Sequence, residues 1–130
     1  MATINLTNKT VTSDLTSDAI SSTVKKTATV TQGGISRTNI TAVVGSSASD
    51  MTVIEHVDHS AGAYVYLKNA AASGGLNLFV KFEATAAGAT YEMYLTPGEW
   101  ALFPWAADTS DIRVYASAGT GCLLEYGVFE

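Results

Sequence analysis

Cysteine and charged side chains are both scarce in this sequence of 130 residues. The single cysteine, Cys122, excludes an intrachain disulfide and a cysteine-based metal cage, and its apolar neighbours predict a small buried side chain. Charged residues make up 15% of the chain, against about 25% in an average soluble protein. Glycine, alanine, serine and threonine are abundant instead, a composition typical of β-rich extracellular and virion proteins.

Clusters of basic residues, which a nucleic-acid surface needs, are also missing. The formal net charge is −5 at pH 7. The 7 lysines and arginines are scattered apart from Lys25-Lys26, whereas phosphate binding requires them to lie together. We therefore expect no nucleic-acid partner.

Long apolar segments are absent as well. The sequence has no run of about 18 apolar residues and no charged-then-apolar leader. It therefore predicts neither a membrane span nor a signal peptide, and we expect a protein made in a cytoplasm with no membrane partner. A chain of this length suits one compact domain with a sizeable core, preceded by a tail.

Residues 1–34 lack aromatic side chains and are rich in threonine and serine. Alternation within Thr3–Thr7 and Thr27–Thr31 predicts two extended strands, because β-branched threonine favours that conformation. A serine–aspartate pair at residues 13–14 or 17–18 would cap a short helical turn through Ile20. Two hypotheses fit the segment: a flexible tail, or an extended N-terminal arm that becomes ordered by adding a strand to a neighbour.

From Gly33 onward, short apolar segments alternate with turn-forming residues at close intervals. Such spacing indicates an antiparallel sandwich or barrel. We therefore predict an all-β fold, with an arm over residues 1–34 and a jelly-roll-like antiparallel β-sandwich over residues 35–130. The expected strands are Ile35–Val44, Met51–Val57, Ala63–Asn69, Leu76–Glu83, Thr90–Leu95, Glu99–Phe103, Ile112–Ser117 and Cys122–Phe129.

A proline–glycine turn separates two of these strands, Thr90–Leu95 and Glu99–Phe103. Pro97 presets φ at the first turn position, and Gly98 accepts the positive φ that a type II turn needs at the second. Pro104 has no amide hydrogen to donate to a ladder, so we expect it to end the second strand.

Alternation of apolar and polar residues predicts which side chains are buried. In the strand Leu76–Glu83, the predicted core face carries Leu76, Leu78, Val80 and Phe82. The opposite face carries Asn77, Lys81 and Glu83. The last strand has apolar residues on both faces, so we predict that it is central or covered by a partner.

Candidate catalytic and metal-binding residues are few. Glu55–His59 contains two histidines and two acids, which together can hold a divalent ion. In a strand His56 and His59 point to opposite faces, so a metal site requires a turn at Asp58, and a polar strand end is the simpler interpretation. The chain has no Gly-x-Ser-x-Gly elbow, and Gly119-Thr120-Gly121 lacks the rest of a phosphate loop. We predict no catalytic, metal or cofactor site and no enzyme activity.

Tryptophan and tyrosine are more numerous than one small core requires. These side chains favour interfaces because they bury a large area and carry a polar group. They suit either stacking on sugar rings or packing against another subunit, and we favour packing because sugar sites usually also carry clustered Asp, Asn and Arg. The interface candidates are Ile4, Leu6, Tyr64, Tyr66, Trp100, Trp105, Tyr115 and Phe129.

Four segments between residues 50 and 130 carry a resemblance to a known class of proteins. They are Ala63–Asn69 (AYVYLKN), Leu95–Pro104 (LTPGEWALFP), Asp111–Ser117 (DIRVYAS) and Leu124–Glu130 (LEYGVFE). These segments resemble small virion structural proteins of tailed phages, most nearly those of the capsid decoration or cement kind.

The resemblance implies a non-enzymatic β-sandwich, often a homotrimer, that is synthesised in the host cytoplasm and sits on the outer capsid surface of the virion. Its partner would be the major capsid protein, and the arm would help to tie neighbouring subunits together. Two alternatives stay open: a tail or head–tail structural component, and a carbohydrate- or receptor-binding module.

Overall fold

The computed structural model divides the chain into two compact units, Met1–Thr31 and Gln32–Glu130. The residues whose structure it describes are 2–12, 20–30, 33–44, 52–59, 62–83, 90–107, 110–119 and 121–130. The serine–aspartate pairs at which we expected a helical turn lie outside these ranges, and Ile20 is the first residue of a strand.

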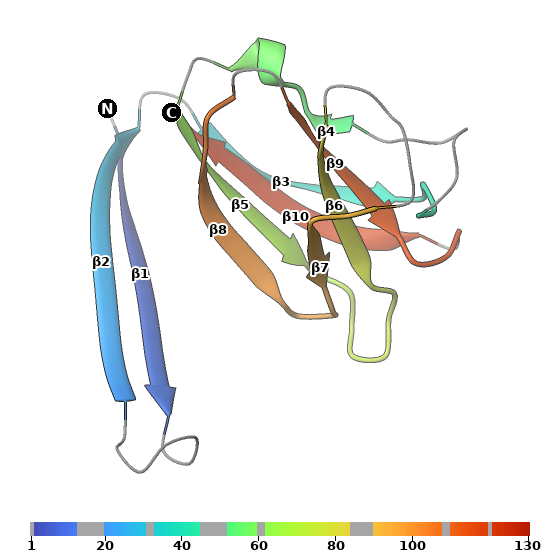
Figure 1. Ribbon diagram of the computed structural model, residues 1–130, viewed down its shortest axis with the longest axis horizontal. Coiled ribbons are helices and arrows are strands. Elements are labelled where there is room, and N and C mark those ends of the chain that lie inside the picture. Colours follow the sequence, from blue (N-terminus) through green and yellow to red (C-terminus); the bar gives the residue numbers. More distant parts are fainter. Residues whose placement is uncertain are drawn as a thin grey trace. The chain divides into compact units, whose positions relative to one another are not determined.

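The first unit is a β-hairpin (Figure 1). Its strands β1 (Ala2–Thr12) and β2 (Ile20–Val30) pair antiparallel over their whole length. Both strands are longer than the segments Thr3–Thr7 and Thr27–Thr31, in which the alternation of side chains predicted them. The described part of the arm is therefore a ribbon of two paired strands, and each predicted segment falls in one of them apart from Thr31, which is outside the described residues.

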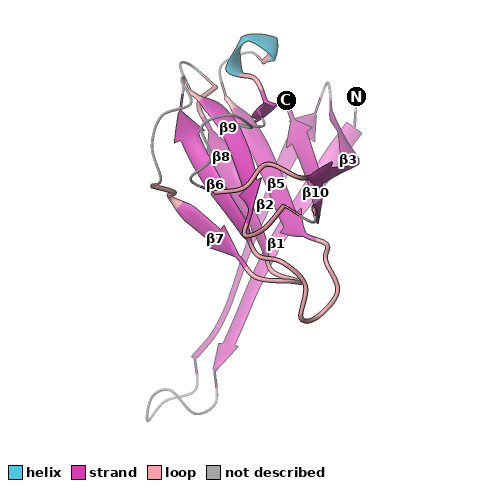
Figure 2. Ribbon diagram, turned by 90° about the vertical axis from the view of Figure 1, so that its right-hand side faces the viewer, coloured by secondary structure: helices cyan, strands magenta, loops and turns pink. Residues whose placement is uncertain are grey.

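The second unit contains two four-stranded sheets that pack face to face (Figure 1, Figure 2). The first sheet has the order β3-β10-β5-β8, and the second has the order β4-β9-β6-β7. All strand pairs within them are antiparallel, which confirms the predicted antiparallel β-sandwich. The strands are β3 (Gly33–Ile40), β4 (Thr52–Ile54), β5 (Ala63–Asn69), β6 (Leu78–Glu83), β7 (Met93–Leu95), β8 (Trp100–Trp105), β9 (Asp111–Ala116) and β10 (Cys122–Phe129).

The strand order is that of a jelly roll. Among the eight described strands of the sandwich, the first, eighth, third and sixth form one sheet, and the second, seventh, fourth and fifth form the other. Within this set, β6 and β7 alone follow each other along the chain and also pair in one sheet. Every other connection crosses between sheets, as in the jelly-roll-like sandwich that we predicted, although the sequence did not predict the strand order.

The core lies between the two sheets and follows the alternation of the strands. In β5 every second residue from Ala63 to Asn69 is buried. In β6 the predicted core residues Leu78 and Val80 are fully buried, and Leu76 and Phe82 pack against the core. β10 lies between β3 and β5, which confirms the prediction of a central last strand.

The Pro97-Gly98 turn has the type II form that the sequence predicts. Gly98 has a φ of 88°, and the amide of Glu99 donates to the carbonyl of Thr96 over 2.9 Å. The strands that it joins, β7 and β8, lie in different sheets. The turn therefore carries the chain from one sheet to the other instead of forming a hairpin.

The prediction that Pro104 ends its strand is wrong. β8 continues to Trp105, and Pro104 lies opposite Tyr64 of β5. β8 is an edge strand of its sheet. An edge strand tolerates proline because amide hydrogens on its outer side need no partner in the ladder.

The expected strand Met51–Val57 is shorter than predicted. β4 ends at Ile54, and one turn of 3-10 helix, η1 (His56–Asp58), follows it. The amide of His56 donates to Oδ1 of Asp111 over 3.0 Å. It is therefore not available for a hydrogen bond between strands. Asp111 lies 55 positions further along the chain, beyond the reach of a local sequence pattern.

The expected strand Ile35–Val44 also ends early, because the chain changes sheets after β3. The amide of Ala116 donates to the carbonyl of Ala42 over 2.7 Å, and the amide of Val44 donates to the carbonyl of Ala116 over 3.1 Å. Ala42 and Val44 are therefore attached to β9, in the sheet opposite β3.

Asn69, the last residue of β5, has a completely buried side chain that connects the two sheets. Its Nδ2 donates to the carbonyls of Leu76 and Leu95, 2.9 and 3.0 Å away. Its Oδ1 accepts from the amide of Ala71 over 3.1 Å and from the thiol of Cys122 over 3.3 Å. One side chain thus satisfies backbone groups at the points where the chain crosses between sheets.

We expect Asn69→Ala to lower the free energy of unfolding by about 3 kcal/mol, because buried carbonyls and an amide lose their partners. Urea unfolding measures the change. Asn77→Ala is the matched control, since Asn77 contacts Ser117 through its backbone, and it should cost less than about 1 kcal/mol. Equal losses in the two variants would contradict the role of Asn69.

Candidate functional site

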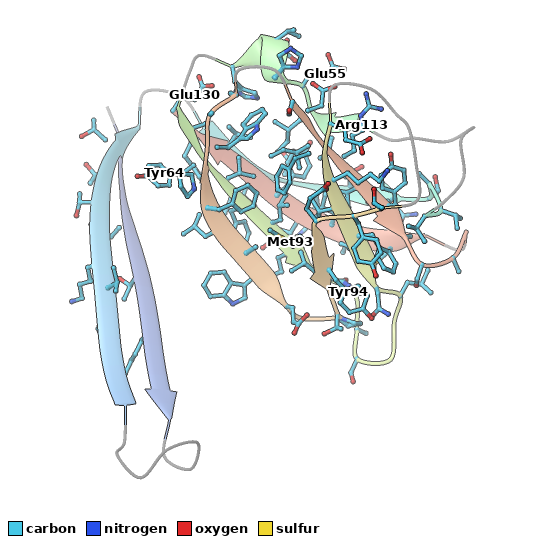
Figure 3. The ribbon with its side chains drawn as sticks, viewed as in Figure 1. Glu55, Tyr64, Met93, Tyr94, Arg113 and Glu130 are labelled. Atoms are coloured by element: carbon cyan, nitrogen blue, oxygen red, sulfur yellow. The ribbon has the colours of Figure 1, made fainter. Side chains whose placement is uncertain are left out.

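One face of the first sheet covers the core, and its other face is the candidate functional site. The register between β3, β10, β5 and β8 arranges the residues of that face in rows across the sheet. Tyr64 points away from the sandwich interior (Figure 3). We call this surface the outer face, and it consists of Ile35, Arg37, Tyr64, Tyr66, Lys68, Trp100, Leu102, Leu123, Glu125 and Phe129.

Apolar side chains occupy neighbouring rows of the outer face. Tyr64 lies opposite Phe129, and Tyr66 lies opposite Gly127 on one side and Leu102 on the other. A Cβ on Gly127 would come within 2.9 Å of the Phe129 ring, so this glycine lets the ring lie against the backbone. The result is a continuous apolar strip across β10, β5 and β8.

Several large hydrophobic side chains of the outer face are open to solvent. The exposed fraction is 62% for Ile35 and 53% for Trp100, and Leu123 is exposed as well. Contiguous apolar surface marks interaction sites, whereas hydrophobic residues scattered singly over a surface are ordinary. The outer face therefore has the character of a protein-binding surface.

One row of the outer face is charged and is held by short hydrogen bonds. Nε and Nη2 of Arg37 lie 2.7 and 2.6 Å from Oε2 of Glu125, and the hydroxyl of Tyr66 donates to Oε1 of Glu125 over 3.1 Å. The bond from Arg37 lowers the pKa of Glu125, and burial together with the bond to Glu125 raises the pKa of Tyr66. At neutral pH Glu125 is thus ionised and Tyr66 protonated, which fixes the direction of both interactions.

The corresponding face of the second sheet is largely covered. The exposed fraction is 3% for Tyr115 and 2% for Lys81. Nζ of Lys81 lies 3.6 Å from Oε1 of Glu83 and 5.9 Å from the centre of the Tyr115 ring. Lys81 faces away from the core as predicted, but its side chain is buried, because a nearby carboxylate and an aromatic ring accompany its charge.

Two tyrosines at the edge of the second sheet stay exposed. The ring centres of Tyr91 and Tyr94 lie 6.4 Å apart, with the planes inclined by 34°. Phe79 contacts both rings, at 4.5 and 5.1 Å between centres. Tyr94 lies on the short edge strand β7 (Figure 3).

The structure brings four of our eight interface candidates together. Tyr64, Tyr66, Trp100 and Phe129 all lie on the outer face. Trp105 and Tyr115, which we expected to be exposed, are buried. Alternation along β8 turns Trp105 to the core side, and Tyr115 lies on the covered face of the second sheet.

The other two candidates, Ile4 and Leu6, lie in β1, opposite Ala28 and Lys26, and their side chains are outside the described part of the chain. Three apolar residues of the outer face were not among the predicted interface candidates: Ile35, Leu102 and Leu123. Alternation in the last strand contained a signal for Leu123, because this residue shares a face with Glu125 and Phe129.

The two histidines bind different carboxylates. Nδ1 of His56 lies 2.7 Å from Oδ1 of Asp111, and Nδ1 of His59 lies 2.6 Å from Oε1 of Glu130. Glu55 and Glu130 lie toward the η1 end of the sandwich (Figure 3). Although η1 supplies the turn that a metal site required, the described residues contain no group of three or more potential ligands. The two pairs instead fasten η1 to β9 and to the end of β10.

No family model, curated protein or solved structure matches this chain. Across the described ranges, no helix has the length and apolar character to cross a membrane. The basis for a functional proposal is therefore the fold, the outer face and the sequence resemblance.

Asp111 makes the η1 end of the sandwich sensitive to pH. Burial raises its pKa, but hydrogen bonds from the backbone and ring of His56 and the charge of Arg113 outweigh burial, so the pKa lies below 3.8. A carboxylate with a lowered pKa stabilises the fold above its ordinary pKa, and this contribution is lost as the pH falls through the pKa of the folded state.

We expect Asp111→Asn to lower the free energy of unfolding by about 2 kcal/mol at neutral pH, because His56 and Arg113 lose a charged acceptor. Urea unfolding at a series of pH values should show this difference shrinking below about pH 3.8. Asp58→Asn is the control, since Asp58 is exposed. A difference independent of pH would show that the Asp111 charge is not its source.

Proposed function

We propose that the chain is a non-enzymatic structural protein of a phage virion, a decoration or cement protein that binds the outer surface of the capsid. The outer face carries the proposal, because it exposes an apolar strip beside a fixed charged row. In this proposal the outer face packs against the major capsid protein.

An extended sheet surface suits a protein partner better than a small ligand. Small-molecule sites are concave and enclose most of the ligand. Protein interfaces instead combine an apolar centre with a polar rim and are enriched in tyrosine, tryptophan and arginine. On the outer face Tyr64 and Tyr66 lie on an inner strand, Trp100 on one edge strand and Arg37 on the other. Because Arg37 is already paired with Glu125, this pair brings no unpaired charge into an interface.

The jelly roll is compatible with a place on a capsid. Capsid and lectin domains often have this fold, although a fold by itself does not determine a function. The resemblance of residues 50–130 to decoration proteins supports the same class. A protein that binds the assembled shell, and not its separate subunits, stabilises the shell by mass action and needs no active site.

A carbohydrate- or receptor-binding module is the second candidate, and the exposed pair Tyr91 and Tyr94 favours it. Both rings contact Phe79, which steadies them as a surface on which a sugar ring can stack. A glycan array separates the candidates: a specific glycan signal that Tyr94→Ala abolishes would favour the sugar site over the capsid.

We expect Ile35→Asp to weaken binding to empty capsids of the encoding phage by at least about tenfold, because the interface would have to desolvate a new charge. Cosedimentation with purified shells measures the dissociation constant. Val57→Asp is the matched control, since Val57 is also β-branched, is 71% exposed and lies in η1 outside the outer face.

Both replaced side chains are exposed, so circular dichroism and urea unfolding should show a folded protein in each case. Failure of the unaltered protein to sediment with shells would overturn the capsid proposal. Equal weakening by Ile35→Asp and Val57→Asp would show that the outer face is not the binding surface.

A further inference from the structure

We propose that the chain forms a two-fold dimer in which β3 of one copy pairs antiparallel with β3 of a second copy. The pairing joins two four-stranded sheets into one sheet of eight strands. This interaction goes beyond the capsid proposal, because it joins copies of this chain and needs no other partner.

β3 is an edge strand that lacks the usual protection against pairing. An edge strand presents a row of unpaired backbone groups, which proteins protect by shortening the strand or by placing proline or lysine on it. Among the four described edges of the sandwich, β4 and β7 have only 3 residues each, and β8 contains Pro104. β3 has 8 residues, none of them proline or lysine. It is therefore the edge most suited to a further strand.

Two close approaches show which backbone groups of β3 point toward β10. A Cβ on Gly33 would lie 2.6 Å from the carbonyl oxygen of Val128. A Cβ on Gly127 would lie 2.7 Å from the carbonyl oxygen of Gly34. Gly34 and Val128 lie opposite each other, so both of their carbonyls point into the ladder between β3 and β10. Such a pair exchanges both hydrogen bonds, and the residues next to it point the other way.

The ladder on the other side of β10 agrees with this assignment. The amide of Ala70, which follows β5, donates to the carbonyl of Leu123 over 2.8 Å. Odd-numbered residues of β10 thus bond toward β5, and even-numbered residues bond toward β3. By alternation, four residues of β3, which we call the edge residues, direct their amides and carbonyls away from β10: Gly33, Ile35, Arg37 and Asn39. Within the described ranges, no backbone hydrogen bond outside the β3–β10 ladder involves the edge residues.

One register pairs all the edge residues without placing like charges opposite each other. It has the two-fold axis at Ser36, so that Gly33 lies opposite Asn39 of the second copy. Ile35 then lies opposite Arg37 of the second copy. An axis at Ile35 would carry Asn39 past the start of the second β3. An axis at Arg37 would place two arginines opposite each other, which destabilises a pair of strands.

A second copy is the partner that these observations fit. A two-fold contact is self-complementary, because each copy supplies the same edge and satisfies the backbone groups of the other. Pairing β3 with the opposite edge of another copy would instead place it against β8, where Pro104 has no amide hydrogen to donate. This edge therefore favours a dimer over a ring such as the trimer that the sequence resemblance implies. The same proline stops the eight-stranded sheet from growing at its ends.

The dimer also extends the outer face. A two-fold axis between neighbouring antiparallel strands is perpendicular to the sheet, so the outer faces of both copies lie on the same side of the joined sheet. Ile35, which is 62% exposed in one copy, then lies at the centre of that sheet. The aliphatic part of Arg37 of the second copy packs beside it. Since Arg37 is bound to Glu125 within its own copy, it brings no unpaired charge into the contact.

Light scattering on the full chain tests the dimer. The unaltered protein should have twice the monomer mass of 13.6 kDa. Ile35→Pro should raise the dissociation constant by at least about tenfold, because proline removes an edge amide and leaves the β3–β10 ladder complete. Ile35→Val is the matched control, since it keeps that amide, and should change the constant by less than about threefold. Circular dichroism and urea unfolding check that both variants are folded.

Cysteine cross-linking tests the register. At the axis the two Ser36 Cα atoms lie about 4.5 Å apart, within the range of about 4.4–6.8 Å that a disulfide spans. Ser36→Cys should therefore form a covalent dimer with oxidised glutathione. Thr38→Cys is the control on the same strand, since the two Thr38 residues lie about 13 Å apart and should not cross-link. Cys122 is buried and should stay reduced in both variants. Equal cross-linking of the two variants would overturn this register.

The dimer and the capsid proposal can fail separately. Ile35→Asp, which should weaken shell binding, should leave the dimer intact, because an aspartate at this position lies opposite Arg37 of the second copy. A monomer or a trimer of the unaltered protein, or a dimer that Ile35→Pro does not weaken, would overturn the pairing of β3. Each of these results leaves the capsid proposal standing, because shell binding is measured separately.

Discussion

The buried side-chain amide of Asn69 forms hydrogen bonds with backbone groups at places where the jelly roll changes sheets. Nearly every connection in this topology crosses between sheets. At each crossing the chain leaves the hydrogen-bond ladder of one sheet, and its backbone amides and carbonyls pass the edge of the core without partners from that ladder. Near the crossings that follow β5 and β7, the carbonyls of Leu76 and Leu95 bind the same side chain. An apolar residue of equal size would fill the space but leave those carbonyls without donors. The polar end of β5 is therefore as much a part of the core as its apolar middle.

The two sheets share this core but differ on their other faces. The second sheet buries Lys81 and Asp111 beside oppositely charged groups, so its charges are compensated within the molecule. The first sheet keeps Ile35 and Trp100 in contact with water. Apolar area of this kind lowers the free energy only when another surface covers it. The outer side of the first sheet therefore retains apolar area that the described part of the molecule does not cover.

Local alternation was enough to predict the fold and much of the core, because the side-chain period of a strand depends on its own residues. The bounds of β5 and the burial of Val80 followed from it. The errors arise from contacts between residues far apart in sequence. Pro104 is tolerated within β8 because β8 is an edge strand, and the strand before His56 ends early because the His56 amide binds Asp111. Composition likewise predicted aromatic residues at an interface. Which of them share a face, however, depends on the register between β10, β5 and β8, and this register places Trp105 on the core side instead of the outer face.

Three of the four basic side chains of the second unit, Arg37, Lys81 and Arg113, lie beside a carboxylate of the same unit. The outer face carries two cations, Arg37 and Lys68, and one anion, Glu125, and Arg37 is already paired with that anion. Covering this pair therefore desolvates no unpaired charge. At a protein interface of this kind, apolar area supplies most of the free energy of binding, and charge supplies the selectivity.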